Sequence, residues 1–176
     1  MSNSDAAVKT YKELRNLGVM EANGYFEKFF EFLKETRVSF SWNFEDIENK
    51  GEKVIELNGA VTYLTKILAD NRAKETRLMF IGNGGSAAIA AHALEDYANI
   101  GGFKTVDFFS PALLTCMAND YGYENVFAKP IEMFAVKDDM LFAISSSGKS
   151  PNIITAVNTA KSCGCKIITF SGFGAD

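Results

Sequence analysis

The 176-residue sequence lacks any apolar run near the roughly 20 residues needed to span a bilayer, and its polar N-terminus is unlike a secretory signal peptide. It also lacks a cluster of lysine or arginine, and its formal net charge is −4. An acidic chain without a basic patch argues against a nucleic-acid surface. We therefore expect a cytoplasmic protein that binds neither membranes nor nucleic acids.

Cysteine is scarce and odd in number, since the sequence has only Cys116, Cys163 and Cys165. Cys163 and Cys165 could be imagined as a metal or redox pair, but they lack Cys-x-x-Cys spacing and no second pair exists. An odd count in a chain of this character favours reduced thiols. We interpret all three as small residues that are buried or half-buried.

Apolar residues make up 47% of the sequence and charged residues 23%, which is ordinary for a globular protein of one domain with a real core. The region before residue 77 predicts two helices. Residues 21–37 form the first, with an aromatic face at i, i+3, i+4 and i+7 that consists of Phe26, Phe29, Phe30 and Leu33. Such a face suits either the core or a subunit interface, where aromatic residues are enriched.

The second predicted helix covers residues 46–71, after a connector at 39–49. Its apolar residues recur every three or four positions: Val54, Leu57, Val61, Leu64, Ile67 and Leu68. Because both helices precede the first strand, they must cover the sheet or pair with another copy. We therefore divide the chain into an N-terminal helical segment, 1–76, for packing or oligomerisation, and a core, 77–176.

The core alternates strands and helices. The predicted strands are 78–81, 105–109, 140–144 and 166–171. The predicted helices are 86–99, 110–117, 126–134 and 152–162. Continuous apolar strands that alternate with helices indicate a mostly parallel sheet covered on both faces. The fold class is therefore α/β, a three-layer sandwich preceded by two helices, with ligands expected at the carboxyl ends of the strands.

The first of these strand ends carries a glycine loop, Gly82–Ala87, that opens a helix. Backbone N–H groups and the helix dipole at such a turn suit an anion such as a phosphate. The loop fits G-x-G-x-x-A, the dinucleotide-binding fingerprint, and Asp107 lies where a ribose acceptor would be expected. It is not a Walker loop. A nicotinamide or flavin site therefore stays open on this loop alone.

A second loop favours a different ligand. Residues 145–150 also follow a buried strand and open a helix, and they offer four hydroxyl groups, on Ser145, Ser146, Ser147 and Ser150. Serine-rich turns and helix caps are common, but one cap needs only one serine. Two such loops that converge on one phosphate favour a phosphosugar site over a dinucleotide site.

Three ordered motifs carry a family resemblance. They are Gly-Asn-Gly-Gly-Ser-Ala-Ala from Gly82, Ala-Asn-Asp-Tyr-Gly-Tyr-Glu-Asn-Val-Phe-Ala from Ala118, and Ile-Ser-Ser-Ser-Gly-Lys-Ser-Pro-Asn from Ile144. Together they resemble the sugar isomerase (SIS) domain family, and within it the sedoheptulose 7-phosphate isomerases, also called phosphoheptose isomerases. The resemblance implies a parallel α/β sandwich, assembled as a homotetramer, that binds a sugar phosphate.

The resemblance also implies roles for individual residues. The phosphate ligands would be Ser86, Ser145, Ser146, Ser147 and Ser150. The sugar ligands would be Asn83, and Asn119 with Asp120 in a turn-rich loop. The family interconverts aldoses and ketoses through an enediol, which needs a base and an acid. These would be Asp96 and His92, which lie four residues apart on one helical face.

Several positions depart from the family pattern. Asp96 stands where the family has a catalytic Glu, so its carboxylate lies more than an ångström back. Ile89 and Ala91 replace a usual Asp and Gln, and Lys149 replaces a usual Asn. The chain also ends at Asp176, before the family's last strand and helix, which carry a catalytic His. We expect no required cofactor, although His92 and Asp96 could help to hold a divalent metal such as zinc.

Two functions follow from these observations. The favoured one is isomerisation of a sugar phosphate such as sedoheptulose 7-phosphate. The alternative is a non-catalytic SIS module that binds a phosphosugar or a protein partner as a regulator.

Overall fold

The computed structural model describes residues 37–40 and 53–172. The chain divides into two compact units, 1–65 and 66–176, and each is described by itself. The helix predicted at 21–37 lies outside the described residues except for Arg37, which is in a strand. The division into units falls inside a helix.

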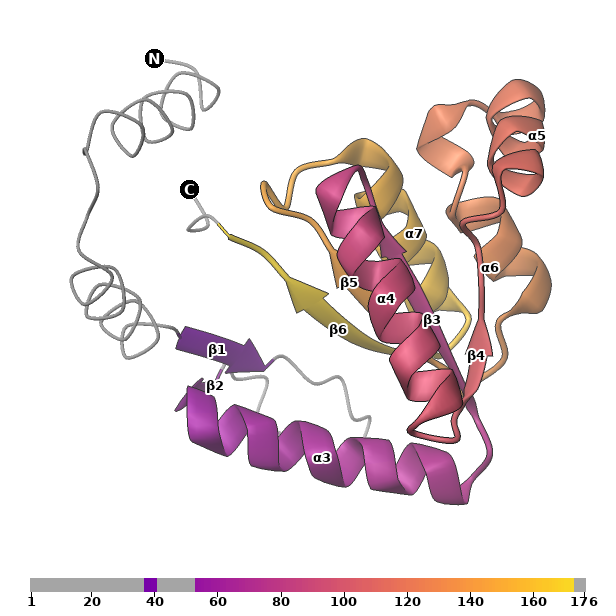
Figure 1. Ribbon diagram of the computed structural model, residues 1–176. Coiled ribbons are helices and arrows are strands. Elements are labelled where there is room, and N and C mark those ends of the chain that lie inside the picture. The colour runs from indigo at the N-terminus through magenta and orange to yellow at the C-terminus, as the bar shows by residue number, and fades with distance from the viewer. Residues whose placement is uncertain (1–36, 41–52, 173–176) are drawn as a thin grey trace, which may run out of the picture. The chain divides into compact units, whose positions relative to one another are not determined.

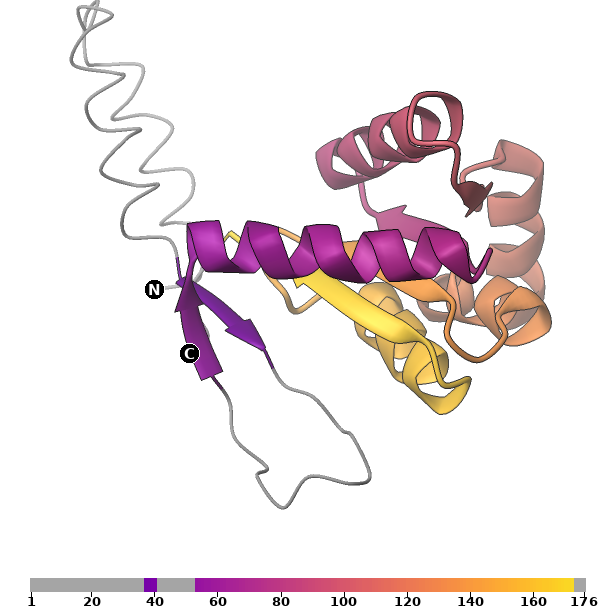
Figure 2. The same cartoon turned by 90° about the horizontal axis from the view of Figure 1, so that it is seen from below.

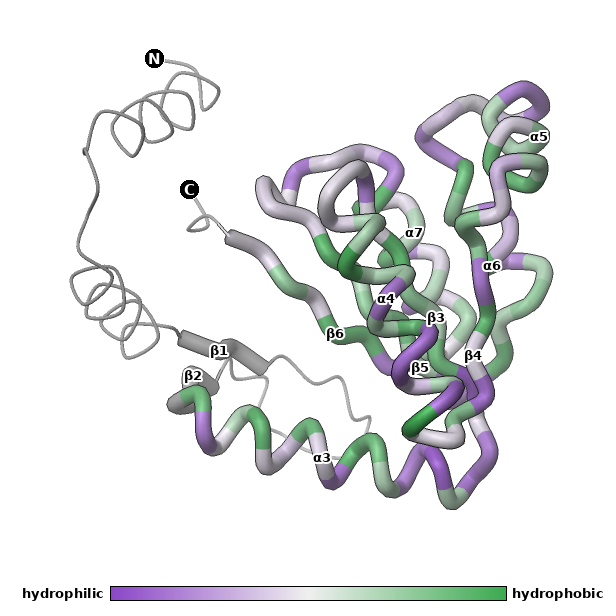
Figure 3. The backbone as a smooth tube through the Cα atoms, viewed as in Figure 1, coloured by the Kyte–Doolittle hydropathy of each residue, from purple (hydrophilic) through white to green (hydrophobic). Residues whose placement is uncertain are grey.

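A short hairpin replaces part of the predicted second helix. Strand β1 (Arg37–Phe40) pairs antiparallel with β2 (Lys53–Glu56), and helix α3 (Leu57–Ala73) follows without a break. The prediction was a helix over 46–71 after a connector at 39–49. It was wrong for residues 39–40 and 53–56, which are in strands, and residues 41–52 lie outside the described residues. Val54 and Ile55 are β-branched, and their pairing with β1 overrides the helical spacing that they share with later residues. Along α3 itself, hydrophobic and hydrophilic residues alternate around the helix (Figure 3).

The second unit is built on a four-stranded parallel sheet in the order β4-β3-β5-β6. The strands are β3 (Arg77–Gly82), β4 (Lys104–Val106), β5 (Met140–Ile144) and β6 (Lys166–Phe170). Strands β3 and β5 are neighbours, and their register pairs Leu78 with Met140 and Gly82 with Ile144. Both strands therefore end at the same level, and the loops that follow them begin side by side (Figure 1).

Helices cover both faces of this sheet, which confirms the three-layer α/β sandwich. Helix α4 (Gly85–Asn99) packs on one face, where the stacked rings of Phe80 and Phe142 lie 4.6 Å apart and Tyr97 of α4 lies 5.5 Å from Phe80. Helix α7 (Pro151–Ser162) lies on the other side of the strands (Figure 2). None of the helices in the described part of the chain has the length and apolar character of a membrane span.

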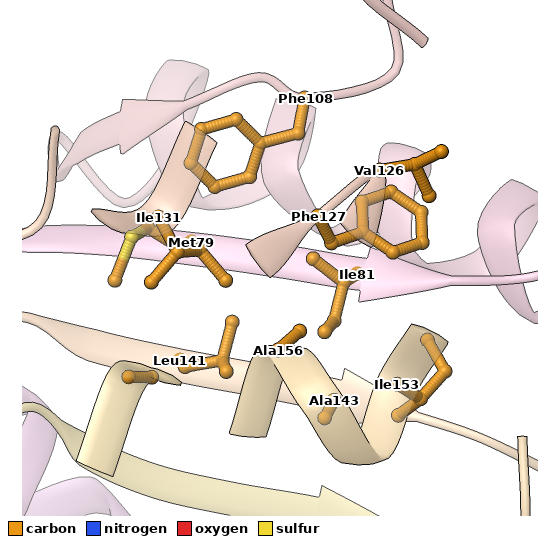
Figure 4. Packing of buried hydrophobic residues seen from close by; sticks show 11 residues of the cluster. Met79, Ile81, Phe108, Val126, Phe127, Ile131, Leu141, Ala143, Ile153 and Ala156 are labelled. Carbon is orange, nitrogen blue, oxygen red and sulfur yellow. The ribbon is translucent and has the colours of Figure 1, made fainter. Parts of the chain in front are cut away.

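The larger part of the core lies on the α7 side. Side chains of β3 and β5 alternate between the two faces, so that Met79 and Ile81 point away from α4. They meet a layer from the helices and loops beyond, as Figure 4 shows. The layer contains Phe108, Val126, Phe127, Ile131, Ile153 and Ala156, all nearly or fully buried. This packing fixes α7, and with it the loop that precedes α7.

Three element bounds in this unit differ from the prediction by two residues or more. Helix α5 (Pro111–Tyr121) runs past residue 117, so the expected loop begins only at Gly122. A 3₁₀ turn, η1 (Tyr123–Asn125), follows, and helix α6 (Ala128–Phe134) starts later than the predicted residue 126. Strand β4 ends at Val106, although the prediction extends it to residue 109. Just after the strand, the Asp107 carboxylate accepts a hydrogen bond of 2.6 Å from the Phe109 backbone N–H.

The amino ends of β3 and β5 are joined by a buried charge. The Asp139 carboxylate, 1% exposed, accepts hydrogen bonds from the Arg77 backbone N–H at 2.9 Å and from the Arg77 guanidinium at 2.7 and 3.0 Å. The Val136 backbone N–H adds another at 3.0 Å, and the guanidinium also donates to the Phe134 carbonyl. Both Asp139 oxygens therefore accept hydrogen bonds. The ion pair lies at the opposite end of the sheet from the two loops.

The three cysteines are free thiols, as predicted, but not all of them are buried or half-buried. Cys163 and Cys165 are half-buried, whereas Cys116 is exposed, so the prediction was wrong for Cys116. Helix α5 presents Cys116 to solvent beside Asp120. Burial, with the nearby Asp139 carboxylate second, raises the pKa of Cys165 to about 12.

Candidate functional site

The first loop is shaped by two glycines. Gly84 has φ of 53°, a left-handed conformation that favours glycine. A Cβ on Gly82 would lie 2.6 Å from the carbonyl carbon of Ser86, so the first turn of α4 sits directly against the end of β3. The Asn83 carbonyl accepts the backbone N–H groups of Ser86 and Ala87, at 3.0 and 3.3 Å.

Two amides of this loop are left for a ligand. Within the described residues, the backbone N–H groups of Gly84 and Gly85 have no hydrogen-bond partner. They lie at the N-terminus of α4, and Ser86 adds a half-buried hydroxyl group in the first turn. Unpaired amides at a helix N-terminus form the concave positive site that suits an anion.

The second loop follows β5 and is held by its own backbone. The Ser145 N–H donates to the Phe170 carbonyl at 2.9 Å, and the Gly148 N–H donates to the Ser145 carbonyl at 3.1 Å. Gly148 has φ of 64°, which closes the turn. The Lys149 N–H donates to the Ser147 hydroxyl oxygen at 3.2 Å. Ser150 then precedes α7 as its N-cap residue.

The four hydroxyls of this loop have unequal exposure. Ser145 is 7% exposed, and its hydroxyl lies 3.5 Å from that of Ser150. Ser146 and Ser147 are exposed to solvent. The loop therefore presents an inner pair of hydroxyls and an outer pair at the carboxyl end of β5. The Lys149 side chain is exposed, and no ion pair involves it among the residues that the structure describes.

An amide pair ties the two loops together. The Asn83 Nδ2 donates to the Asn152 Oδ1 at 2.9 Å, and the Asn152 Nδ2 donates back to the Asn83 Oδ1 at 2.8 Å. The Tyr123 hydroxyl donates to the same Asn83 oxygen at 3.2 Å. The structure thus brings together three of the motifs that the sequence singled out, from β3, η1 and α7.

Sequence reasoning did not single out Asn152 or Tyr123. Both lie inside the motifs that carry the resemblance, but nothing in a single sequence pairs residues 83 and 152. Asn152 is 2% exposed in the first turn of α7, and a buried amide needs a polar partner, but this burial is visible only in the structure.

The candidate catalytic residues lie further along α4. The His92 Nε2 and the Asp96 Oδ2 are 3.5 Å apart, one helical turn from each other, as the spacing predicts. Their side chains are 75% and 53% exposed. At 1.5 Å of rise per residue, His92 lies about 9 Å and Asp96 about 15 Å beyond Ser86 along the helix axis. The structure places them on the helix that the first loop begins, but out of contact with the serines.

The predicted sugar ligands Asn119 and Asp120 are in the last turn of α5 rather than in a loop. The Asn119 Nδ2 donates to the Asp120 Oδ1 at 2.8 Å, and both residues are exposed. The other Asp120 oxygen lies 3.6 Å from the Cys116 sulfur, and its charge raises the pKa of the Cys116 thiol. Gly122 and η1 connect this turn to Tyr123, and so to the Asn83 amide.

A metal fits this site only in part. His92 and Asp96 are suitable ligand types at a suitable spacing, but zinc sites use at least three protein ligands. No group of three or more metal-ligating side chains exists among residues 37–40 and 53–172. The described residues therefore offer two ligands and not a complete set.

The family model of the SIS domain matches residues 44–172. A phosphoheptose isomerase of Vibrio cholerae is 36% identical over 112 residues, which are 61% of this chain and 59% of that protein. The chain therefore matches 58–59% of the length of such curated relatives.

Solved structures give the same result. The phosphoheptose isomerase of Neisseria gonorrhoeae superposes with a TM-score of 0.61 at 29% identity, covering 65% of this chain and 62% of that one. The phosphoheptose isomerase of Francisella tularensis superposes with a TM-score of 0.64 at 25% identity, covering 86% of this chain and 75% of that one.

Proposed function

Because this chain belongs to the SIS domain family, we propose that it binds a sugar phosphate and interconverts its ketose and aldose forms, with sedoheptulose 7-phosphate as the substrate. The observation that carries the proposal is the pair of Ser/Gly loops that follow β3 and β5. These two strands end at the same level of the sheet, and hydrogen bonds between Asn83 and Asn152 join the two loops. Relatives named phosphoheptose isomerase support the choice of substrate.

The phosphate is held by hydroxyls and amides of both loops. The proposed ligands are the unpaired N–H groups of Gly84 and Gly85 and the hydroxyls of Ser86, Ser145, Ser146, Ser147 and Ser150. A phosphate has several acceptor oxygens, so a cradle of neutral donors can saturate it. The Lys149 ammonium adds one positive charge at its rim.

The sugar chain extends from the phosphate towards the acid and base on α4. Asn119 and Asp120 are the proposed ligands of its hydroxyls. The resemblance implies the same role for Asn83, but the Asn83 amide is already bonded to Asn152 and Tyr123. Asp96 removes a proton from C1 of the ketose, which gives an enediol, and return of a proton to C2 gives the aldose. His92 supplies and accepts the proton that moves between the oxygens of C1 and C2. Along α4, His92 lies about 9 Å and Asp96 about 15 Å from Ser86, so the proposal requires the sugar chain to lie along the helix and the Asp96 side chain, which tilts towards the helix N-terminus, to reach back to it.

The proposal is tested by assaying the protein with sedoheptulose 7-phosphate in D₂O. We expect aldoheptose 7-phosphate to form, with deuterium on the carbon next to the carbonyl, because the proton held by the base exchanges with solvent before it returns. NMR spectroscopy reads both product and label. D96N keeps the shape of the side chain but removes the base, so it should lose turnover while still binding the substrate. An E95Q variant on the same helix is the matched control.

One observation favours a second function. His92 and Asp96 are largely exposed, and Ile89 beside them, 63% exposed, is apolar where the family has an acid. A protein that binds a phosphosugar, or a partner protein, as a regulator needs the cradle but not the base. Equal, low turnover in wild-type and D96N proteins, with sugar phosphate binding intact in both, would favour this function over isomerisation.

Further features of the proposal come from the family resemblance. We propose a cytoplasmic homotetramer, with residues 1–76 contributing to packing or oligomerisation. Within the tetramer, a second copy could complete the surroundings of the exposed His92–Asp96 pair. Zinc or another divalent metal could bind these two residues with ligands from elsewhere, and no step above is assigned to it.

A further inference from the structure

The Asn83–Asn152 pair uses its amides in a closed, reciprocal way. Each side chain donates one hydrogen bond to the other and accepts one from it, at 2.9 and 2.8 Å. Asn152 is 2% exposed and Asn83 is half-buried. Charge-neutral amides buried in this manner are costly when unpaired, so the two side chains hold each other in one orientation.

The pair lies where it can set the distance between the loops. Asn83 is the residue between Gly82, the last residue of β3, and Gly84, the start of the unpaired amides. Asn152 lies two positions after Ser150, in the first turn of α7. A shift of either asparagine therefore moves donors of one loop relative to hydroxyls of the other.

We propose that Asn83 and Asn152 are positioning residues that hold the two loops at the separation at which both reach one phosphate. The proposal rests on the proposed function, since it concerns the same cradle. It assigns to Asn83 a role other than the sugar contact that the resemblance implies, because its Oδ1 already accepts two hydrogen bonds, from Asn152 and Tyr123, and only one Nδ2–H is left.

Tyr123 extends the pair to a third element. Among the hydrogen bonds of the described residues, the Tyr123 hydroxyl makes the one bond from η1 to the pair, and Tyr123 as a residue is 63% exposed. The exposed ring gives the bond little shelter from water, so it should contribute less than the buried amide pair. Y123F removes only the hydroxyl, so it should weaken phosphate binding less than N83A or N152A does.

The test is a double-mutant cycle of N83A and N152A, read by calorimetric titration with inorganic phosphate and with sedoheptulose 7-phosphate. Each single variant should weaken both ligands by the same factor, about tenfold, the size of effect that a lost hydrogen bond gives when spacing depends on it. The double variant should be no weaker than either single one, because either change alone already breaks the pair. N158A, an exposed asparagine on the same helix, should bind as the wild type does.

Other outcomes overturn the proposal. If N83A weakens only the sugar phosphate and N152A weakens neither ligand, Asn83 is a sugar ligand and not a positioning residue. If the two losses add in the double variant, the residues act independently. If unfolding temperatures fall while the folded variants bind both ligands normally, the pair is only structural. If the wild type itself binds inorganic phosphate and no sugar phosphate, the proposed function fails while the cycle with phosphate still tests the pair.

A second variant protects the test against loss of folding. N152D has the same shape, and its neutral carboxyl group can donate to the Asn83 Oδ1 and accept from the Asn83 Nδ2, whereas its carboxylate can only accept. The phosphate affinity of N152D relative to the wild type at the same pH should therefore rise as the pH falls through the pKa of the new carboxyl group. A ratio that stays constant with pH would contradict a positioning role for the pair.

Discussion

Lys149 is the one residue that gives the predicted phosphate cradle a positive charge. Its ammonium is exposed and makes no ion pair within residues 53–172, so it is available to a ligand. K149Q should lower the affinity for sedoheptulose 7-phosphate about tenfold at low salt, the size expected for one charge-assisted hydrogen bond. Calorimetric titration at several salt concentrations measures the effect.

The dependence of binding on salt distinguishes the contribution of the Lys149 charge from that of the neutral donors around it. The Debye length falls from about 30 Å at 0.01 M to about 8 Å at 0.15 M ionic strength, so the difference between wild type and K149Q should shrink as salt is added. K161Q, at the far end of α7, is the matched control and should bind as the wild type does at every salt concentration. A K149Q protein that equals K161Q at low salt would show that Lys149 does not contact the phosphate.

At the scale of elements, the junction of β3 and α4 depends on the absence of a side chain at Gly82. G82A would place a methyl group 2.6 Å from the Ser86 carbonyl carbon, which is backbone and cannot move aside cheaply. We expect a loss of about 1–3 kcal/mol in the free energy of unfolding, measured by urea denaturation, because overpacking forces the helix away from the strand.

The neighbouring glycine supplies the control for this prediction. A Cβ at Gly85 meets nothing within 4 Å, so G85A should be as stable as the wild type or gain up to about 1 kcal/mol from the lower entropy of the unfolded chain. Equal stabilities of G82A and G85A would mean that α4 does not approach β3 as closely as the structure has it.

The ion pair at the amino ends of β3 and β5 gives a second prediction at this scale. D139N removes the charge that the Arg77 guanidinium meets in a site of 1% exposure, and should cost about 3 kcal/mol of the free energy of unfolding. E75Q, which breaks the exposed ion pair between Glu75 and Lys104, should cause no measurable change. A D139N protein as stable as E75Q would contradict the assigned role of the buried pair.

The elements that were predicted correctly are those with a strong local signal. Strand β5 lies where the prediction has it, at 140–144, because a buried parallel strand is apolar at every position. Strand β2 was missed because Val54 fits the helical spacing of Leu57 and Val61, and its partner β1 is 13 or more residues away in sequence. Helix α5 runs further than predicted, since Asn119 and Asp120 favour turns in isolation but here extend a helix.

At the scale of the whole molecule, the parallel sheet explains which parts of the site a sequence can give. Any parallel order places the carboxyl ends of the strands at one edge, so it was predictable that both Ser/Gly loops lie at the same edge of the sheet. That β3 and β5 are adjacent, and that Asn83 pairs with Asn152 across 69 residues, depends on tertiary packing, which no local pattern encodes. The roles of His92 and Asp96 stay predictions, because no ligand contact fixes them.

The central claim is that the two loops form one phosphate site. An NMR titration of the labelled protein with sedoheptulose 7-phosphate tests it most directly, through the backbone amides of Gly84, Gly85 and Ser86 in one loop and of Ser146 to Ser150 in the other. We predict that amides of both loops shift and saturate along one binding curve with a single dissociation constant. Shifts confined to one loop, or two different dissociation constants for the two loops, would contradict the claim.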